Sequence, residues 1–126
     1  MNIPGRRINR DEVVVSSPFS RGGDGLFFRV QLIDQGGTTT NGTSIKVFTR
    51  NHEDQWPTSP ITGATLTIPS TAVAGSLHEL HVAPSSTAAD GIKEELRLEI
   101  TGVDTEGWMV IRILSPLFYD AAISTI

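Results

Sequence analysis

Two of the three histidines lie in the segment His78-Glu79-Leu80-His81, which has residue types found in zinc-binding helices. A zinc metalloprotease helix places its two histidines four residues apart, so that both imidazoles lie on one face. Here the spacing is three, and on a strand residues 78 and 81 point to opposite faces. We therefore expect His78 and His81 to be strand or loop histidines that share no metal ion.

The third histidine lies in the cluster His52-Glu53-Asp54, within a segment that the sequence predicts to be a loop. Functional groups often lie on loops, and a histidine next to an acid could serve as a base or as a metal ligand. Adjacent side chains rarely converge on one point, however, and the sequence assigns no second cluster to meet this one. A polar loop tip explains the composition equally well.

Other signatures of catalysis do not occur in the sequence. It contains no Gly-x-Ser-x-Gly elbow to present a serine nucleophile and no cysteine. The turn Gly22-Gly23-Asp24-Gly25 has neither the spacing of a dinucleotide fingerprint nor the ending of a phosphate loop. We expect this turn to reverse the chain before a strand, and we expect a protein that is not an enzyme and holds no metal or cofactor.

The elements that must position these residues are strands, because apolar and polar residues alternate repeatedly along the chain. Antiparallel strands separated by Gly, Pro and Ser are typical of a sandwich, so we predict an all-β fold, a single antiparallel β-sandwich of about seven strands, with little helix. The predicted strands span residues 12–17, 26–33, 43–50, 64–69, 77–83, 94–101 and 108–115. The predicted core comprises Phe28, Val30, Ile45, Val47, Leu66, Leu80, Leu96, Leu98, Ile100, Ile111 and Ile113.

The connections between these strands carry further predictions. Gly102 to Gly107 has the composition of a turn, so we expect residues 94–101 and 108–115 to form a β-hairpin. Residues 51–63 contain two prolines that cannot join a central ladder, and we expect them to cross between the sheets. Residues 1–11 carry three arginines and little to bury, so we expect a flexible arm there and the β-sandwich domain over residues 12–126.

The last predicted strand is apolar on both faces and suggests an interface. Met109, Ile111 and Ile113 alternate with Trp108 and Val110, so something must cover the second face. Burial between two layers would explain the same pattern. If the outer faces are free, aromatic and arginine side chains of the kind enriched in interfaces lie on them. The candidate interface residues are Phe27, Phe48, Trp108, Arg112, Leu114, Phe118 and Tyr119.

Charge and composition restrict the partners. Ten basic residues against fourteen acidic ones give a formal net charge of −4, which argues against a nucleic-acid partner. No apolar run reaches the length of a membrane span, and the N-terminus lacks the apolar region of a signal peptide. We expect a soluble protein that is made in the cytoplasm and has no membrane partner.

A cysteine-free β-domain with an arginine-bearing arm, a loop rich in Thr and Gly and an apolar tail resembles the accessory proteins of phage particles, such as head-decoration or tail-associated subunits. The resemblance implies a non-enzymatic role in assembly, in the virion, and transfers no functional residue. We therefore expect a structural protein that self-associates or coats a capsid-like or tail-like assembly. The alternative is a carbohydrate-binding module that offers Trp56, Trp108 or Tyr119 to a sugar ring.

Overall fold

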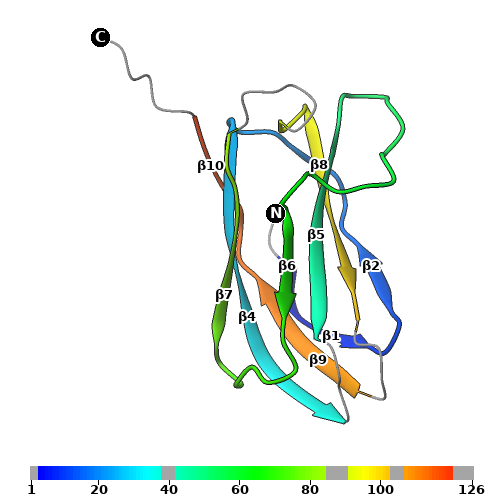
Figure 1. Cartoon of the computed structure of the whole chain (residues 1–126), viewed down its shortest axis with the longest axis vertical. Helices are drawn as coiled ribbons and strands as arrows, with labels where there is room; N and C mark the ends of the chain where they lie inside the picture. The colour runs from blue at the N-terminus through cyan, green and yellow to red at the C-terminus, as the bar shows by residue number, and fades with distance from the viewer. Residues whose placement is uncertain (1–2, 38–41, 85–90, 103–106, 121–126) are drawn as a thin grey trace.

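The computed structural model of the chain describes residues 3–37, 42–84, 91–102 and 107–120 (Figure 1). These residues form ten strands and no helix, which confirms the all-β prediction with more strands than the seven expected. None of the described residues forms a helix long and apolar enough to cross a membrane. The strands are β1 (Ile3–Asn9), β2 (Val13–Val15), β3 (Phe19–Ser20), β4 (Gly25–Gly37), β5 (Thr43–Arg50), β6 (Thr65–Ile68), β7 (Leu77–Val82), β8 (Glu95–Thr101), β9 (Gly107–Ile113) and β10 (Leu117–Tyr119).

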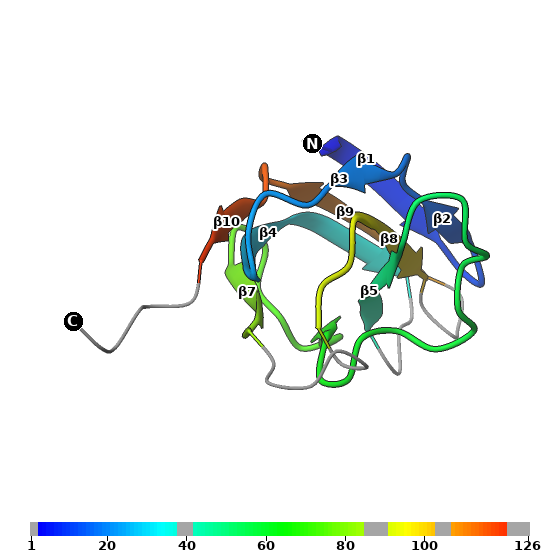
Figure 2. The same cartoon turned by 90° about the horizontal axis from the view of Figure 1, so that it is seen from above.

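The strands form two antiparallel sheets that pack together as a sandwich. In sheet A the order is β1-β9-β4-β10. β9 and β10 pair with successive parts of one edge of β4, and β7 pairs with the opposite edge. In sheet B the order is β2-β8-β5-β6, and β3 also pairs with β8. The view from above in Figure 2 shows β4 and β9 on one side of the molecule and β5 and β8 on the other.

The core lies between the two sheets and follows the alternation of the sequence. Leu26, Phe28, Val30 and Leu32 all face inward from β4, because side chains two residues apart on a strand share a face. Ten of the eleven predicted core residues are buried. The exception is Leu66, which is only partly buried because β6 is an edge strand and covers the core from one side.

The N-terminal segment is not the flexible arm that we expected. Residues 3–9 form β1, which pairs with β9 along the edge of sheet A. Ile8 is fully buried there, and the Arg7 guanidinium lies 4.7 Å from the centre of the Trp108 ring. The sequence suggested an arm because the segment has few apolar residues, but its main-chain hydrogen bonds to β9 fix it in place.

Two predicted connections are also wrong. β8 and β9 do not form a hairpin, because β8 pairs with β2, β3 and β5 in sheet B and β9 pairs with β1 and β4 in sheet A. Residues 51–63 do not cross between sheets, because they lie in the connection from β5 to its neighbour β6 in sheet B. Alternation tells which face of a strand is buried, but it does not tell which strand lies beside it.

Candidate functional site

The cluster at residues 52–54 contacts Arg50 and Glu95, two residues that the sequence alone did not connect with it. Arg50 is the last residue of β5 and lies directly opposite Glu95, the first residue of β8. The Arg50 Nε and Nη2 atoms donate to Glu95 Oε2 at 3.0 and 2.9 Å, and Nη1 donates to the carbonyl of Asp54 at 2.8 Å. The strand register therefore places a half-buried ion pair beneath the loop that carries His52.

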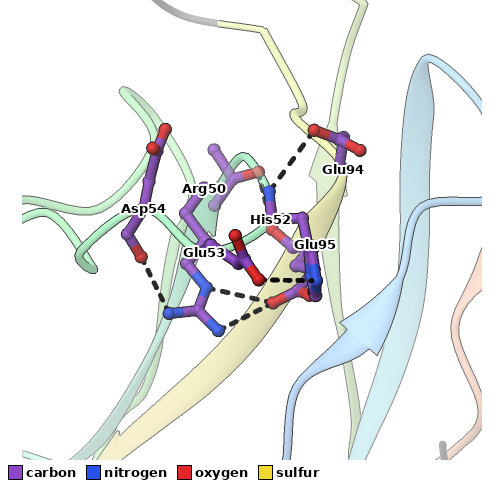
Figure 3. A network of polar contacts seen from close by, with 7 residues as sticks. Arg50, His52, Glu53, Asp54, Glu94 and Glu95 are labelled. Atoms are coloured by element: carbon purple, nitrogen blue, oxygen red, sulfur yellow. Dashed lines mark hydrogen bonds and ion pairs between the residues drawn. The ribbon is translucent and has the colours of Figure 1, made fainter.

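His52 completes this network from above, as Figure 3 shows. Its Nδ1 atom donates to Glu95 Oε1 at 2.7 Å, and its backbone N–H donates to Glu94 Oε1 at 3.3 Å. The hydrogen bond from His52 and the contacts from Arg50 hold the pKa of the Glu95 carboxyl below its usual 4.5. Both carboxylate oxygens of Glu95 are thus occupied by donors from the end of β5 and from the loop that follows it.

An imidazole oriented by a carboxylate is also the core of many catalytic sites, so the surroundings of His52 matter. Its Nε2 atom is 3.9 Å from Glu53 Oε1, and the side chain is 67% exposed. His78 and His81 lie on β7 in the other sheet, where His78 contacts the Ser76 hydroxyl and His81 contacts the Tyr119 hydroxyl. Among the described residues, no three His, Asp or Glu side chains are placed to hold a metal ion. The contacts of the network join the loop to β8 and so stabilise the position of the loop on sheet B.

The same loop covers the outer face of sheet B with an aromatic ring. The Arg50 and Arg97 guanidinium groups lie 4.4 and 4.6 Å from the centre of the Trp56 ring. Arg97 also lies over Phe48, whose side chain is only 4% exposed although it points away from the core. Phe48 is therefore buried against its own chain, whereas the interface prediction placed it on a free outer face.

Sheet A has a different outer face, which contains most of the candidate interface residues. Phe27 and Leu114 are half-buried there, and Tyr119 and Arg112 are exposed. Trp108 is half-buried beneath Arg7, whereas Phe118 turns inward and packs against the core beside the Phe19 ring. Further exposed apolar side chains extend this face beyond the predicted set. Its exposed apolar residues are Ile33, Leu77, Leu117 and Tyr119.

A groove of about 250 Å³ opens on this outer face beside β4. Ile113 lies opposite Val30, but Leu117 lies opposite Phe27, so the chain from β9 to β10 contains one residue more than β4 does. The extra residue makes a bulge, and bulges often occur beside functional sites. The groove is lined by Phe27, Phe28, Arg29, Leu114, Ser115 and Leu117.

Comparison with known proteins finds no family model, no curated protein and no solved structure that matches this chain. The function must therefore be argued from the two surfaces described above. On sheet B the network of Arg50, His52 and Glu95 fastens a loop over the outer face, and on sheet A the outer face presents apolar side chains and a groove.

Proposed function

We propose that this chain is a non-enzymatic structural protein that associates with copies of itself through the outer face of sheet A. The sequence resemblance to accessory proteins of phage particles suggests a larger assembly, such as a virion, as the setting. In this proposal the protein supplies binding surface and performs no reaction.

The observation that carries this proposal is the apolar character of one outer face. Leu117 is 63% exposed and Leu77 is 54% exposed, and both lie on the side of sheet A that points away from the core. Removing such a side chain from water stabilises a complex by about 1.5–3 kcal/mol. Leu117 lies beside Phe27, and the exposed Arg29–Glu79 ion pair lies between these residues and Leu77. Exposed apolar surface rimmed by polar residues is typical of protein interaction sites.

The contrast between the two sheets supports the choice of face. Phe48 on sheet B is buried beneath Arg97, which also contacts Trp56 of the loop, and polar residues such as Lys46 and Glu99 lie opposite one another beside it. The outer face of sheet A shows no such cover in the part of the chain that the structure describes, because Leu77 and Leu117 stay exposed.

The geometry gives less support to carbohydrate binding. Arg50 and Arg97 lie against Trp56, Arg7 lies against Trp108, and His81 packs on Tyr119 with ring centres 5.6 Å apart. Each of the three rings considered for a sugar platform therefore already contacts a side chain of the same protein.

Sedimentation equilibrium over a range of concentrations tests the proposal. We expect the wild-type protein to associate reversibly, and Leu77→Ser to raise the dissociation constant about tenfold or more, because each 1.4 kcal/mol is a factor of ten. Val13→Ser is the matched control, since Val13 is also 54% exposed but lies on β2 of sheet B.

A protein that stays monomeric at every concentration would contradict self-association. If Val13→Ser weakened association and Leu77→Ser did not, the contact would lie on sheet B, and the outer face of sheet A would be the wrong surface.

A further inference from the structure

The C-terminal strand β10 occupies a seat made by segments that are distant in sequence. Its three residues pair with β4, where Leu117 lies opposite Phe27 and Tyr119 lies opposite Gly25. The Phe118 ring packs at a centre-to-centre distance of 6.3 Å from Phe19 of β3. The seat therefore lies wholly outside the segment that leads into β10.

Two glycines shape this seat, Gly23 in the turn before β4 and Gly25 at the start of β4. A methyl group on Gly23 would come within 2.5 Å of the Tyr119 carbonyl oxygen, and one on Gly25 would overlap the Tyr119 ring. We expected the Gly22-Gly23-Asp24-Gly25 segment only to reverse the chain. In the structure its missing side chains also make room for the strand, so the segment acts as a receptor for β10.

The link between β9 and β10 is suited to act as a hinge. It consists of residues 114–116, it contains the bulge, and Pro116 has no N–H with which to join the β4 ladder. β10 itself has only three residue pairs, all of them with β4. Detaching so short a strand breaks few main-chain hydrogen bonds, whereas the longer β9 stays anchored on both of its edges.

We propose that β10 is exchanged between copies, so that the β10 of one chain lies in the seat of a second copy. This inference rests on the self-association proposed above and specifies how it occurs. The seat meets the same residues whichever copy supplies the strand, and exchange of an identical element is a low-cost way to form a dimer.

The length of the hinge fixes where the two copies must meet. Three extended residues span at most about 10 Å, so the copies must pack directly against each other at the point where β9 ends. Leu114 and Ser115 of the hinge line the apolar groove, and Leu117 forms its border. Exchange would therefore bring the groove of each copy into the interface and cover it.

The test is disulfide trapping, which suits a chain with no cysteine. Leu117 and Phe27 are direct partners in an antiparallel ladder, where the Cα separation of about 4.5–5.5 Å suits a disulfide. The variant Phe27→Cys/Leu117→Cys is oxidised at a concentration at which sedimentation shows a dimer. We expect a covalent dimer on a non-reducing gel, because each disulfide would join two chains.

The control is Gln31→Cys/Arg112→Cys, which joins β4 to β9 on the same face. It should give only covalent monomer, because β9 stays in its own chain. If Phe27→Cys/Leu117→Cys also gave only monomer from a protein that sediments as a dimer, exchange would be wrong and self-association would stand. Protein that never sediments as a dimer would overturn both proposals.

A mixing experiment gives an independent answer if the double variant does not fold. Gly25→Val blocks the seat, and Phe118→Ser weakens the strand that must fill it. Each variant alone should lose at least tenfold in dimer affinity, and an equimolar mixture should recover a heterodimer with one intact seat. A mixture that associates no better than its two components would overturn the exchange.

Discussion

Glu95 is the residue on which the loop over sheet B depends, since it accepts hydrogen bonds from both His52 and Arg50. These donors stabilise the ionised carboxylate and lower its pKa in the folded protein. As the pH falls below the usual value of 4.5, the unfolded chain takes up a proton at this position before the folded chain does. The stability that Glu95 contributes is therefore present above that pH and is lost as the pH falls through the lowered pKa.

We predict that Glu95→Gln lowers the thermal unfolding temperature near pH 6–7 and that its difference from wild type shrinks steadily as the pH is lowered toward 3. Thermal denaturation followed by circular dichroism across this range measures the difference. Glu99→Gln, on the same face of β8 but opposite Lys46, is the control and should keep the wild-type slope. A constant difference between Glu95→Gln and wild type at all pH values would contradict the proposed role of the network.

The sequence identified the loop residues of the network but did not identify Glu95 as their partner. His52, Glu53 and Asp54 are adjacent and visible as a cluster, whereas Glu95 lies 43 residues beyond His52. Only the register of β5 against β8 places Arg50 opposite Glu95, and a single sequence does not fix that register. The Gly22-Gly23-Asp24-Gly25 segment was also visible, but its contact with Tyr119 depends on where β10 lies.

The loop between β5 and β6 is held against the outer face of sheet B by its own side chains. Its Trp56 ring contacts two guanidinium groups, and one of them, Arg97, also lies over Phe48. Each cation–π contact at a partly exposed site is worth about 0.5–1 kcal/mol. The loop should therefore be held to the sheet by interactions that a single substitution removes.

We predict that Trp56→Ala lowers the free energy of unfolding by about 1–2 kcal/mol, the sum of two such contacts. It should also speed amide exchange in residues 51–60, because the loop would detach before the protein unfolds. Gln55→Ala, in the same loop and exposed, is the control. Chemical denaturation and hydrogen exchange make these measurements, and unchanged exchange in the loop of Trp56→Ala would contradict the role given to the ring.

The existence of most strands could be predicted from the sequence, but their neighbours could not. Leu96, Leu98 and Ile100 reveal a strand with one buried face, because burial imposes a period of two on the residues themselves. The same alternation is compatible with either sheet, so the expected hairpin of β8 and β9 was wrong. β1 and β10 were missed as strands because main-chain pairing, rather than a row of apolar residues, holds them in place.

For the whole molecule, the central difference is between an outer face of sheet B on which a loop places Trp56 over two arginines and an outer face of sheet A on which, among the described residues, Leu77 and Leu117 stay exposed. The proposed association would bury the second face, and the exchange of β10 would place the groove at its centre. Both proposals concern the outer face of sheet A, which carries the exposed Leu77 and Leu117 and the groove beside Leu117. The sequence indicated an apolar second face on the last long strand, but it did not reveal that β4, β7 and β10 extend that face.

Hydroxyl-radical labelling at low and high protein concentration, read out by mass spectrometry, tests this claim most directly. We predict that labelling of Ile33, Leu77 and Leu117 falls as the concentration rises, because association removes these side chains from water. Labelling of Val13 and Val15 on sheet B should stay constant and provides the internal reference. If the labelling of Ile33, Leu77 and Leu117 did not change with concentration, the outer face of sheet A would not be an association surface, and the proposed function would be wrong.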